Sequence, residues 1–138
     1  MRHRFGPERR ALKNLLGTVA VVDDDPSMRR SVERLLNAHG IMTEGYPTAE
    51  SFLNEVQAGS IRCIVLDVHL GGMSGIELWH HLKQAGTDIP VVFMTAIEDE
   101  ALEREAVAAG CIAYLRKPFP AEPLITAVKR SLALPSCD

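Results

Sequence analysis

The chain has 138 residues, the size of one compact domain, so we expect a single-domain protein with no room for a separate catalytic or DNA-binding domain. Hydrophobic residues make up 46% of the chain and charged residues 24%, which are the proportions of an ordinary globular domain and exclude wholesale disorder. No apolar run approaches the roughly 18 residues of a membrane span, and the start of the chain lacks the apolar stretch of a signal peptide. We therefore expect a cytoplasmic protein that makes no membrane contact.

The formal net charge of -3 is unevenly distributed along the chain. Residues 1–17 are basic, which leaves an acidic body, and an acidic body argues against nucleic acid as a direct ligand of the folded domain. We interpret residues 1–17 as a basic N-terminal extension, solvated or partly helical, that precedes the domain. The cysteines are far apart and lack the paired spacing of a metal site, which favours a reducing compartment.

From residue 18 onward, short apolar runs alternate five times with amphipathic stretches. Such runs are typical of parallel strands that are buried on both faces, and they predict strands over residues 19–22, 41–46, 61–66, 91–94 and 111–115. Capping residues mark the first three helices between them, which begin after Asp25, Thr48 and Ser74 and end before Gly40, Gly59 and Gly86. The fourth and fifth helices are predicted over residues 98–109 and 121–132.

This alternation predicts an α/β fold, (βα)5, in which right-handed crossovers produce a doubly wound, five-stranded parallel sheet of flavodoxin-like type with strand order 2-1-3-4-5. The predicted domain covers residues 18–133, and residues 134–138 form a C-terminal tail. The helix over residues 98–109 has the weakest apolar stripe, so we expect it to be the helix least anchored to the core.

Polar side chains follow four of the predicted strands at the point where each strand ends. In an open α/β sheet, ligands bind at the carboxyl ends of the strands, so these side chains are expected to converge. They comprise Asp23, Asp24 and Asp25 after the first strand, Asp67 after the third, Thr95 after the fourth and Lys117 after the fifth.

Three carboxylates in one cleft, those of Asp23, Asp24 and Asp67, would repel one another unless a positive charge were present. Mg²⁺ suits such a cluster because it prefers oxygen ligands and typically takes one or two carboxylates together with phosphate oxygens. Lys117 would supply a second positive charge. A pocket of this composition is suited to phosphoryl transfer onto a carboxylate, and the central Asp67 is the predicted acceptor.

These residues, in this order and spacing, resemble the receiver domain of bacterial two-component response regulators, of the chemotaxis-regulator and nitrogen-fixation-regulator type. The resemblance spans residues 18–133. It is carried by the segments Val21-Val22-Asp23-Asp24, Leu66-Asp67 followed by Gly72-Met73-Ser74-Gly75, Met94-Thr95-Ala96, and Lys117-Pro118-Phe119.

The resemblance implies that Asp67 accepts a phosphoryl group from a histidine kinase or a histidine phosphotransfer protein. It implies that Asp24 binds Mg²⁺ directly and that Asp23 does so through water or by shaping the site. The backbone carbonyl of His69 would be a further metal ligand. A receiver of this kind catalyses only its own phosphorylation and dephosphorylation and is not an enzyme acting on a separate substrate.

The resemblance also implies a switch. Thr95 and Lys117 would hold phosphate oxygens, and movement of Thr95 would let Tyr114 turn inward, which repacks the face built from the helix over 98–109, the strand over 111–115 and the helix over 121–132. This face is the expected surface for a downstream protein partner, whose identity the sequence does not indicate. The protein itself is expected to be a monomer or a weak homodimer. The Lys117-Pro118 bond is a candidate cis peptide that aims the lysine.

One departure from the family pattern lies in the loop after Asp67. Many receivers have Met-Pro-Gly there, whereas this chain has Leu70-Gly71-Gly72, which predicts a more flexible loop.

Three other interpretations use the same residues. Asp23-Asp24-Asp25-Pro26-Ser27 also satisfies the pattern of haloacid-dehalogenase-type phosphatases with Asp23 as the nucleophile, although that class needs an acidic pair after the lysine and usually a cap insertion. A flavin or dinucleotide site is disfavoured because the turn after the first strand is acidic and the glycine spacing does not match. A receiver that acts only as an unphosphorylated interaction module is disfavoured because every acid, hydroxyl and lysine position is filled.

Overall fold

Five strands alternate with five helices in the computed structural model, which describes residues 17–55 and 60–133. The strands are β1 (Thr18–Val22), β2 (Thr43–Tyr46), β3 (Ile61–Asp67), β4 (Val91–Thr95) and β5 (Ala113–Arg116). The helices are α2 (Pro26–Ala38), α3 (Ala49–Glu55), α4 (Gly75–Gln84), α5 (Glu100–Ala108) and α6 (Ala121–Ala133). Residues 1–16 of the predicted basic extension and the predicted tail over 134–138 lie outside the described residues, so both remain predictions.

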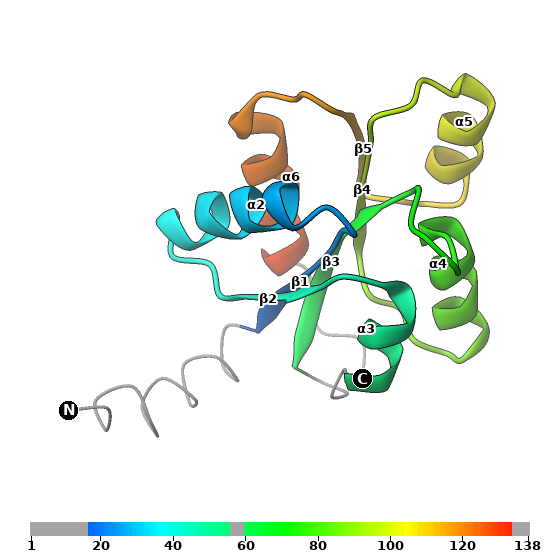
Figure 1. Ribbon diagram of the computed structural model, residues 1–138, viewed down its shortest axis with the longest axis horizontal. Helices are drawn as coiled ribbons and strands as arrows, with labels where there is room; N and C mark the ends of the chain where they lie inside the picture. The colour runs from blue at the N-terminus through cyan, green and yellow to red at the C-terminus, as the bar shows by residue number, and fades with distance from the viewer. Residues whose placement is uncertain (1–16, 56–59, 134–138) are drawn as a thin grey trace.

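The strands form one parallel sheet in the order β2-β1-β3-β4-β5, which confirms the predicted flavodoxin-like fold. Helices α2 and α6 cover one face of the sheet, and α3, α4 and α5 cover the other (Figure 1). Because all five strands run in the same direction, their carboxyl ends lie along one edge. None of the helices in the described parts of the chain is both long enough and apolar enough to cross a bilayer.

The central strand β3 shows why the apolar runs are nearly continuous. Ile64 and Leu66 pack into the core under α3, α4 and α5, whereas Cys63 and Val65 pack into the core under α2 and α6. All four side chains are 0% exposed. A strand buried on both faces has no polar side, so its sequence does not alternate between polar and apolar residues. The charged Asp67 is placed where the strand ends, at the edge of the sheet.

Side-chain caps set the helix starts as predicted for α2 and α4. The Asp25 carboxylate accepts hydrogen bonds from the backbone N–H groups of Ser27 and Met28, and Ser74 forms a reciprocal capping box with Glu77. The helix predicted over residues 98–109 is shorter, because Asp99 rather than Glu98 receives the backbone N–H of Leu102 and begins α5 at residue 100.

Two predicted strands also begin later than expected, because the residues before them are taken by the preceding helix. The N–H of Ile41 donates to the carbonyl of Leu36 at the end of α2, and β2 begins only at residue 43. The N–H of Cys111 donates in the same way to the carbonyl of Ala106, and β5 begins at residue 113.

Helix α5 has the smallest buried side of the five helices. Ala106 is its one buried residue in the described structure, whereas α6 buries five. Polar contacts hold the ends of α5 instead: Arg116 lies 3.1 Å from a carboxylate oxygen of Glu98 and 3.4 Å from one of Glu103, and the Lys83 ammonium donates to the carbonyl of Ala109 at 2.8 Å. Exposed ion pairs contribute little stability, so α5 has a weak hold on the sheet.

We predict that α5 opens before the other well-packed elements in native-state hydrogen exchange. A helix with one buried alanine loses little apolar burial when it detaches, so its opening free energy lies far below that of global unfolding. Backbone amides in residues 104–108 should therefore exchange faster than those of α6, which provides the comparison within the same experiment. Equal protection of the two helices would contradict this expectation.

Candidate functional site

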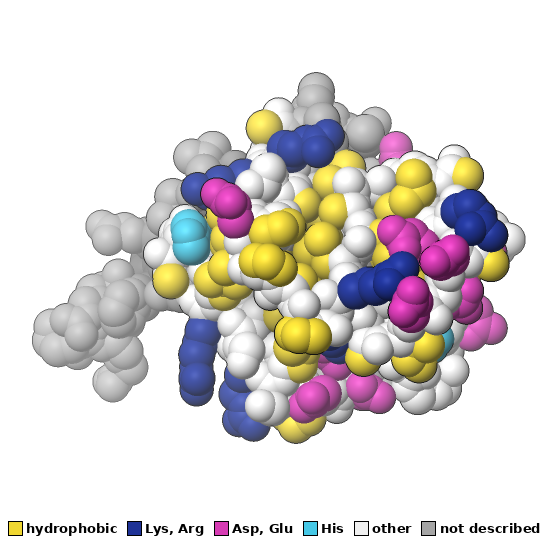
Figure 2. Space-filling model, turned by 90° about the horizontal axis from the view of Figure 1, so that it is seen from above, with side chains coloured by type: hydrophobic (Ala, Val, Ile, Leu, Met, Phe, Trp, Pro, Cys, Tyr) yellow, Lys and Arg dark blue, Asp and Glu magenta, His cyan; other side chains and the backbone are white. Residues whose placement is uncertain are grey.

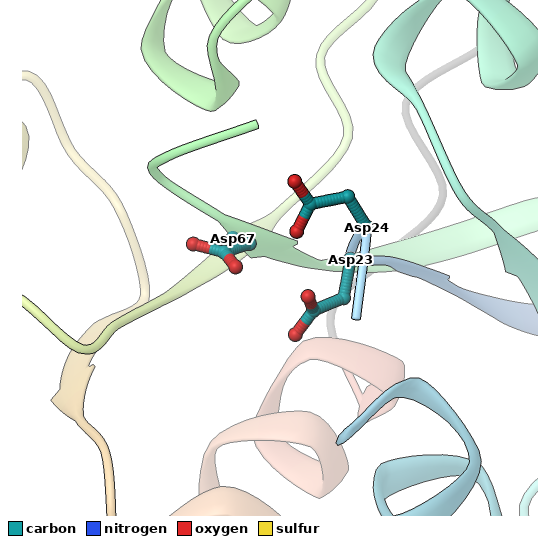
Figure 3. A group of neighbouring side chains, drawn as sticks. All are labelled: Asp23, Asp24 and Asp67. Atoms are coloured by element: carbon teal, nitrogen blue, oxygen red, sulfur yellow. The ribbon is translucent and has the colours of Figure 1, made fainter. Parts of the chain in front are cut away.

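Three carboxylates meet at the carboxyl edge of the sheet. Asp23 and Asp24 follow β1, Asp67 ends β3, and Figure 3 shows the three side chains projecting to the same side of the strand ends. One oxygen from each lies within 4.8 Å of the others. Asp23 is 0% exposed and Asp67 5% exposed, whereas Asp24 is exposed to solvent. The parallel register therefore brings together the acids that the sequence predicted to converge.

Lys117 joins two of these acids. Its ammonium nitrogen lies 3.0 Å from Oδ2 of Asp23 and 3.0 Å from Oδ2 of Asp67, so one side chain from the end of β5 reaches residues that follow β1 and β3. The Lys117-Pro118 peptide bond is cis, as the sequence suggested. The backbone N–H of Lys117 also donates to the carbonyl of Thr95 at 2.7 Å, which ties the end of β5 to the end of β4.

Backbone N–H groups hold the remaining oxygens of the two buried acids. The N–H of Asp25 donates to Oδ1 of Asp23 at 2.9 Å, and the N–H of His69 donates to Oδ1 of Asp67 at 3.0 Å. Each buried carboxylate thus has one oxygen on the lysine and the other on the backbone two residues later. This matches the rule that buried charges are stable only when they are paired and hydrogen-bonded.

The charges in the site are not balanced by the protein. Burial raises the pKa of Asp67 above its ordinary value, against the lowering effect of the His69 N–H and of Lys117. Burial lowers the pKa of Lys117, but its contacts with Asp23 and Asp67 outweigh that effect and raise the pKa overall. One ammonium faces three carboxylates, so the cluster retains negative charge and attracts a cation.

The donor set fits a hard divalent cation. Within residues 17–55 and 60–133, these three aspartates are the one group of at least three acidic, histidine or cysteine residues that could hold a metal ion. All the donors are oxygen atoms, and the exposed Asp24 leaves one side open to water, which suits Mg²⁺ with its retained waters. The carbonyl of His69 as a further ligand remains a prediction, and the side chain of His69 is exposed.

Thr95 and Tyr114 occupy the two strands beyond Asp67 in the sheet. Thr95 is 0% exposed, and its hydroxyl oxygen accepts the N–H of Ile97 at 3.1 Å. Tyr114 packs its ring 6.1 Å from that of Phe93, and its buried hydroxyl has no hydrogen-bond partner among the described residues. Burial raises the pKa of the Tyr114 phenol, with smaller contributions in the same direction from Asp99 and Glu103.

Two features of the site were not anticipated from the sequence. Gly75, at the start of α4, lies so close to β3 that a Cβ atom there would overlap the carbonyl oxygen of Asp67. Arg29 donates from its guanidinium to the carbonyl of Asp23 at 2.8 Å. For Gly75 the signal was present, since a glycine directly after a Ser74 cap is unfavourable in a helix unless space requires it. For Arg29 no sequence motif indicates the contact.

Residues 19–129 match the response regulator receiver domain family. Among curated relatives, the chain is 30% identical over 125 residues to the response regulator protein TodT of Pseudomonas putida, a match that covers 91% of this chain and 55% of TodT. It is 37% identical over 114 residues to the transcriptional regulatory protein FixJ of Azorhizobium caulinodans, covering 83% of this chain and 54% of FixJ. The chain thus spans about half the length of these relatives.

A solved structure agrees with the sequence matches. The structure of the response regulator StyR superimposes with a TM-score of 0.78 at 40% sequence identity, covering 84% of this chain and 59% of that one. The similarity extends over most of this chain, so the fold is shared with that response regulator.

We predict that Asp67→Asn raises the melting temperature in metal-free buffer at neutral pH by a few degrees. The raised pKa means that the folded protein holds this proton more tightly than the unfolded chain does, so ionised Asp67 opposes folding. That penalty is absent below the ordinary value of 3.8, grows as the pH rises toward the raised folded value, and is constant above it. The difference in melting temperature between the variant and wild type should therefore become smaller as the pH falls.

Added Mg²⁺ should make wild type melt at a higher temperature than Asp67→Asn. A ligand that binds only the folded state stabilises it, and the variant has lost one carboxylate donor for the ion. Thermal melts of both proteins over a pH series, with and without Mg²⁺, measure both effects. A variant less stable than wild type in metal-free buffer at neutral pH would refute the electrostatic interpretation.

Proposed function

This chain belongs to the response regulator receiver family, and on that premise we propose that Asp67 accepts a phosphoryl group from a histidine kinase or a histidine phosphotransfer protein. A receiver is a phosphoacceptor and signalling switch, with a cognate histidine kinase, rather than an enzyme that turns over a separate substrate. The observation that carries the proposal is the pairing of Asp67 with Lys117 at 3.0 Å inside the acidic cluster.

The chemistry asks for a carboxylate that can reach solvent. The side chain of Asp67 is 8% exposed, whereas that of Asp23 is fully buried. An oxygen of Asp67 attacks the phosphorus of a phosphohistidine, the new P–O bond forms as the P–N bond breaks, and the imidazole nitrogen keeps the electron pair. Lys117 is in place to leave the carboxylate and bind a phosphoryl oxygen, which supports the transfer by neutralising charge.

Asp23, Asp24, Asp67 and the carbonyl of His69 would hold Mg²⁺ in this proposal. When bound, the ion supplies the positive charge that brings phosphoryl oxygens close to three carboxylates. The excess negative charge of the site and its all-oxygen donor set support this role. Asp23 and Asp67 keep their fixed orientations through backbone N–H contacts, so little rearrangement is needed at the moment of transfer.

The switch begins at Thr95 in this proposal. Its hydroxyl accepts from the N–H of Ile97 at 3.1 Å and donates to the carbonyl of Ile97 at 3.4 Å, and the long second bond can be exchanged for one to a phosphoryl oxygen on Asp67. Tyr114 lies on the neighbouring strand, and its hydroxyl bonds to none of the residues that the structure describes, so its ring gives up no hydrogen bond to them when it rotates. Rotation would release α5, whose hold on the sheet is weak. The change is thereby passed from the phosphorylation site to the surface.

The output surface is the face formed by α5, β5 and α6. Figure 2 shows apolar side chains gathered in the middle of the face seen from above, which in Figure 1 carries β5 with α6 and α5 on either side. Partly exposed Ile112, Leu115 and Phe119 belong to this region, and Arg116 with its acidic partners lies on the α5 side. We propose that a downstream protein, or a second copy of the chain in a weak homodimer, binds here when α5 moves.

We predict that acetyl phosphate with Mg²⁺ labels the protein on Asp67. Incorporation should fall to background in Asp67→Asn and by at least about tenfold in Asp24→Asn, because loss of a residue that merely orients a metal ligand already costs about tenfold or more and Asp24 would be a direct ligand. Glu55→Gln removes an exposed acidic charge outside the site and should behave as wild type. Mass spectrometry of the trapped acyl phosphate locates the label.

The phosphatase interpretation makes the opposite prediction in the same experiment. Label on Asp23 with rapid turnover of phosphate esters would support it and would sink the assignment of Asp67. The complete burial of Asp23 and its contacts with Lys117 and the Asp25 N–H argue against an attacking role for this residue.

We predict that Tyr114→Ala uncouples α5 from the phosphorylation site. In wild type, beryllofluoride with Mg²⁺ should change hydrogen exchange in residues 100–108, because the phosphate mimic draws Thr95 toward Asp67. The alanine variant should show less than about half of that change, since no ring is left to move. Tyr114→Phe should respond as wild type, because the hydroxyl it loses has no partner. An undiminished response in the alanine variant would remove Tyr114 from the mechanism.

A further inference from the structure

The loop of residues 68–74 connects β3 to α4 and directly follows Asp67 in the chain. Its glycines led us to expect a flexible loop. Its ends are held: Val68 and Leu70 are buried in the core, and the N–H of Gly75 donates to the carbonyl of Val68 at 2.9 Å. Between these ends, Gly71 and Gly72 have no side chains that could anchor the backbone, and the partly buried side chain of Met73 packs against the core. Gly71 and Gly72 are both exposed, and Gly72 has a φ of 73°, a conformation that favours glycine.

One carboxylate from outside the loop holds this middle part. Oε2 of Glu50 accepts a hydrogen bond from the backbone N–H of Met73 at 3.1 Å, across 23 positions of sequence. The loop approaches so closely that a Cβ atom on Gly72 would lie 2.9 Å from the same oxygen. The close approach and the positive φ both favour glycine at position 72, while the greater flexibility expected of this loop stays a prediction.

Glu50 is carried by a fixed element. It lies in the first turn of α3, between Ala49 and the core residue Phe52, both 0% exposed. The start of this helix is closed by a reciprocal pair, in which the N–H of Ser51 donates to the Thr48 hydroxyl oxygen at 2.9 Å and the N–H of Thr48 donates to the Ser51 hydroxyl oxygen at 3.2 Å. Because this helix is fixed against the core, its contact with the loop restrains the position of the loop relative to the core.

The same loop sets the orientation of Asp67. The N–H of His69 is the backbone donor to Oδ1 of Asp67, and the start of α4 at Gly75 abuts the carbonyl oxygen of Asp67. A displacement of the loop would therefore move this donor, together with the His69 carbonyl, away from the reacting carboxylate. Misplacement of groups that orient a metal ligand typically lowers metal affinity or activity.

We propose that Glu50 is a positioning residue for the phosphoryl acceptor. It acts through Met73 and the loop over residues 68–74, keeps the N–H of His69 on Asp67, and touches neither the phosphoryl group nor the metal. The inference rests on the proposed role of Asp67. The hydrogen-bond acceptor is the feature that matters, and the negative charge of Glu50 is secondary.

Three variants of the full chain test this proposal. Glu50→Ala removes the acceptor, Glu50→Gln keeps an acceptor oxygen without the charge, and Glu55→Ala removes an exposed acidic side chain from the same helix. The measurements are the Mg²⁺ dissociation constant by calorimetry, the initial rate of labelling by acetyl phosphate, and hydrogen exchange at the N–H of Met73.

For Glu50→Ala we expect about tenfold weaker Mg²⁺ binding or about tenfold slower labelling, with lost protection at Met73. Glu50→Gln should stay within about threefold of wild type, since a neutral acceptor makes a hydrogen bond roughly half as strong. Glu55→Ala should match wild type in all three measurements.

Wild-type values of both Mg²⁺ affinity and labelling rate in Glu50→Ala would overturn the proposal, as would a Glu50→Gln variant as impaired as the alanine. Failure of wild type itself to label on Asp67 would instead overturn the proposed function. The Mg²⁺ affinities and the Met73 exchange would still decide whether Glu50 orders the site, so the two failures are distinguishable.

Discussion

The contact of one lysine with two buried aspartates is the interaction on which the geometry of the candidate site depends. Lys117 reaches Asp23 and Asp67 at the same distance, and the three residues lie at the carboxyl ends of three different strands. A pair of charges taken out of water is stable only if its geometry is good and its other atoms are hydrogen-bonded. The parallel sheet supplies that geometry because it places the carboxyl ends of all its strands on one edge, and the backbone N–H groups of Asp25 and His69 complete the bonding.

The contact also leaves the negative charge of the site only partly neutralised. One ammonium cannot neutralise three carboxylates. Among the described residues, Lys117 forms ion pairs with Asp23 and Asp67 but not with Asp24. The residual negative charge selects for a cation beside the lysine and discourages a free anion. In the function that we propose, a phosphoryl group would therefore enter together with compensating charge, and phosphorylation would depend on both the metal and the lysine.

Much of this arrangement could be predicted from the sequence, and the misses have physical causes. The apolar runs and the right-handed crossover rule lead to the strand order, and the strand order leads to the convergence of Asp23, Asp67 and Lys117. The start of α5 was misplaced because either Glu98 or Asp99 could precede the helix, and only the tertiary structure decides which carboxylate caps it. The contacts of Arg29 and Glu50 were missed because they join segments whose separation along the chain follows no motif.

The buried hydroxyl of Tyr114, which finds no hydrogen-bond partner in the described part of the chain, has an energetic consequence for this arrangement. A buried donor without an acceptor costs roughly 1–3 kcal/mol relative to a satisfied one, which is the same size as the coupling free energies that connect allosteric sites. The arrangement in this structure therefore has a higher free energy than one in which the Tyr114 hydroxyl finds an acceptor. In the switch that we propose, a modest free-energy change at Asp67 would shift the equilibrium, and a fraction of unphosphorylated molecules would already adopt the second arrangement.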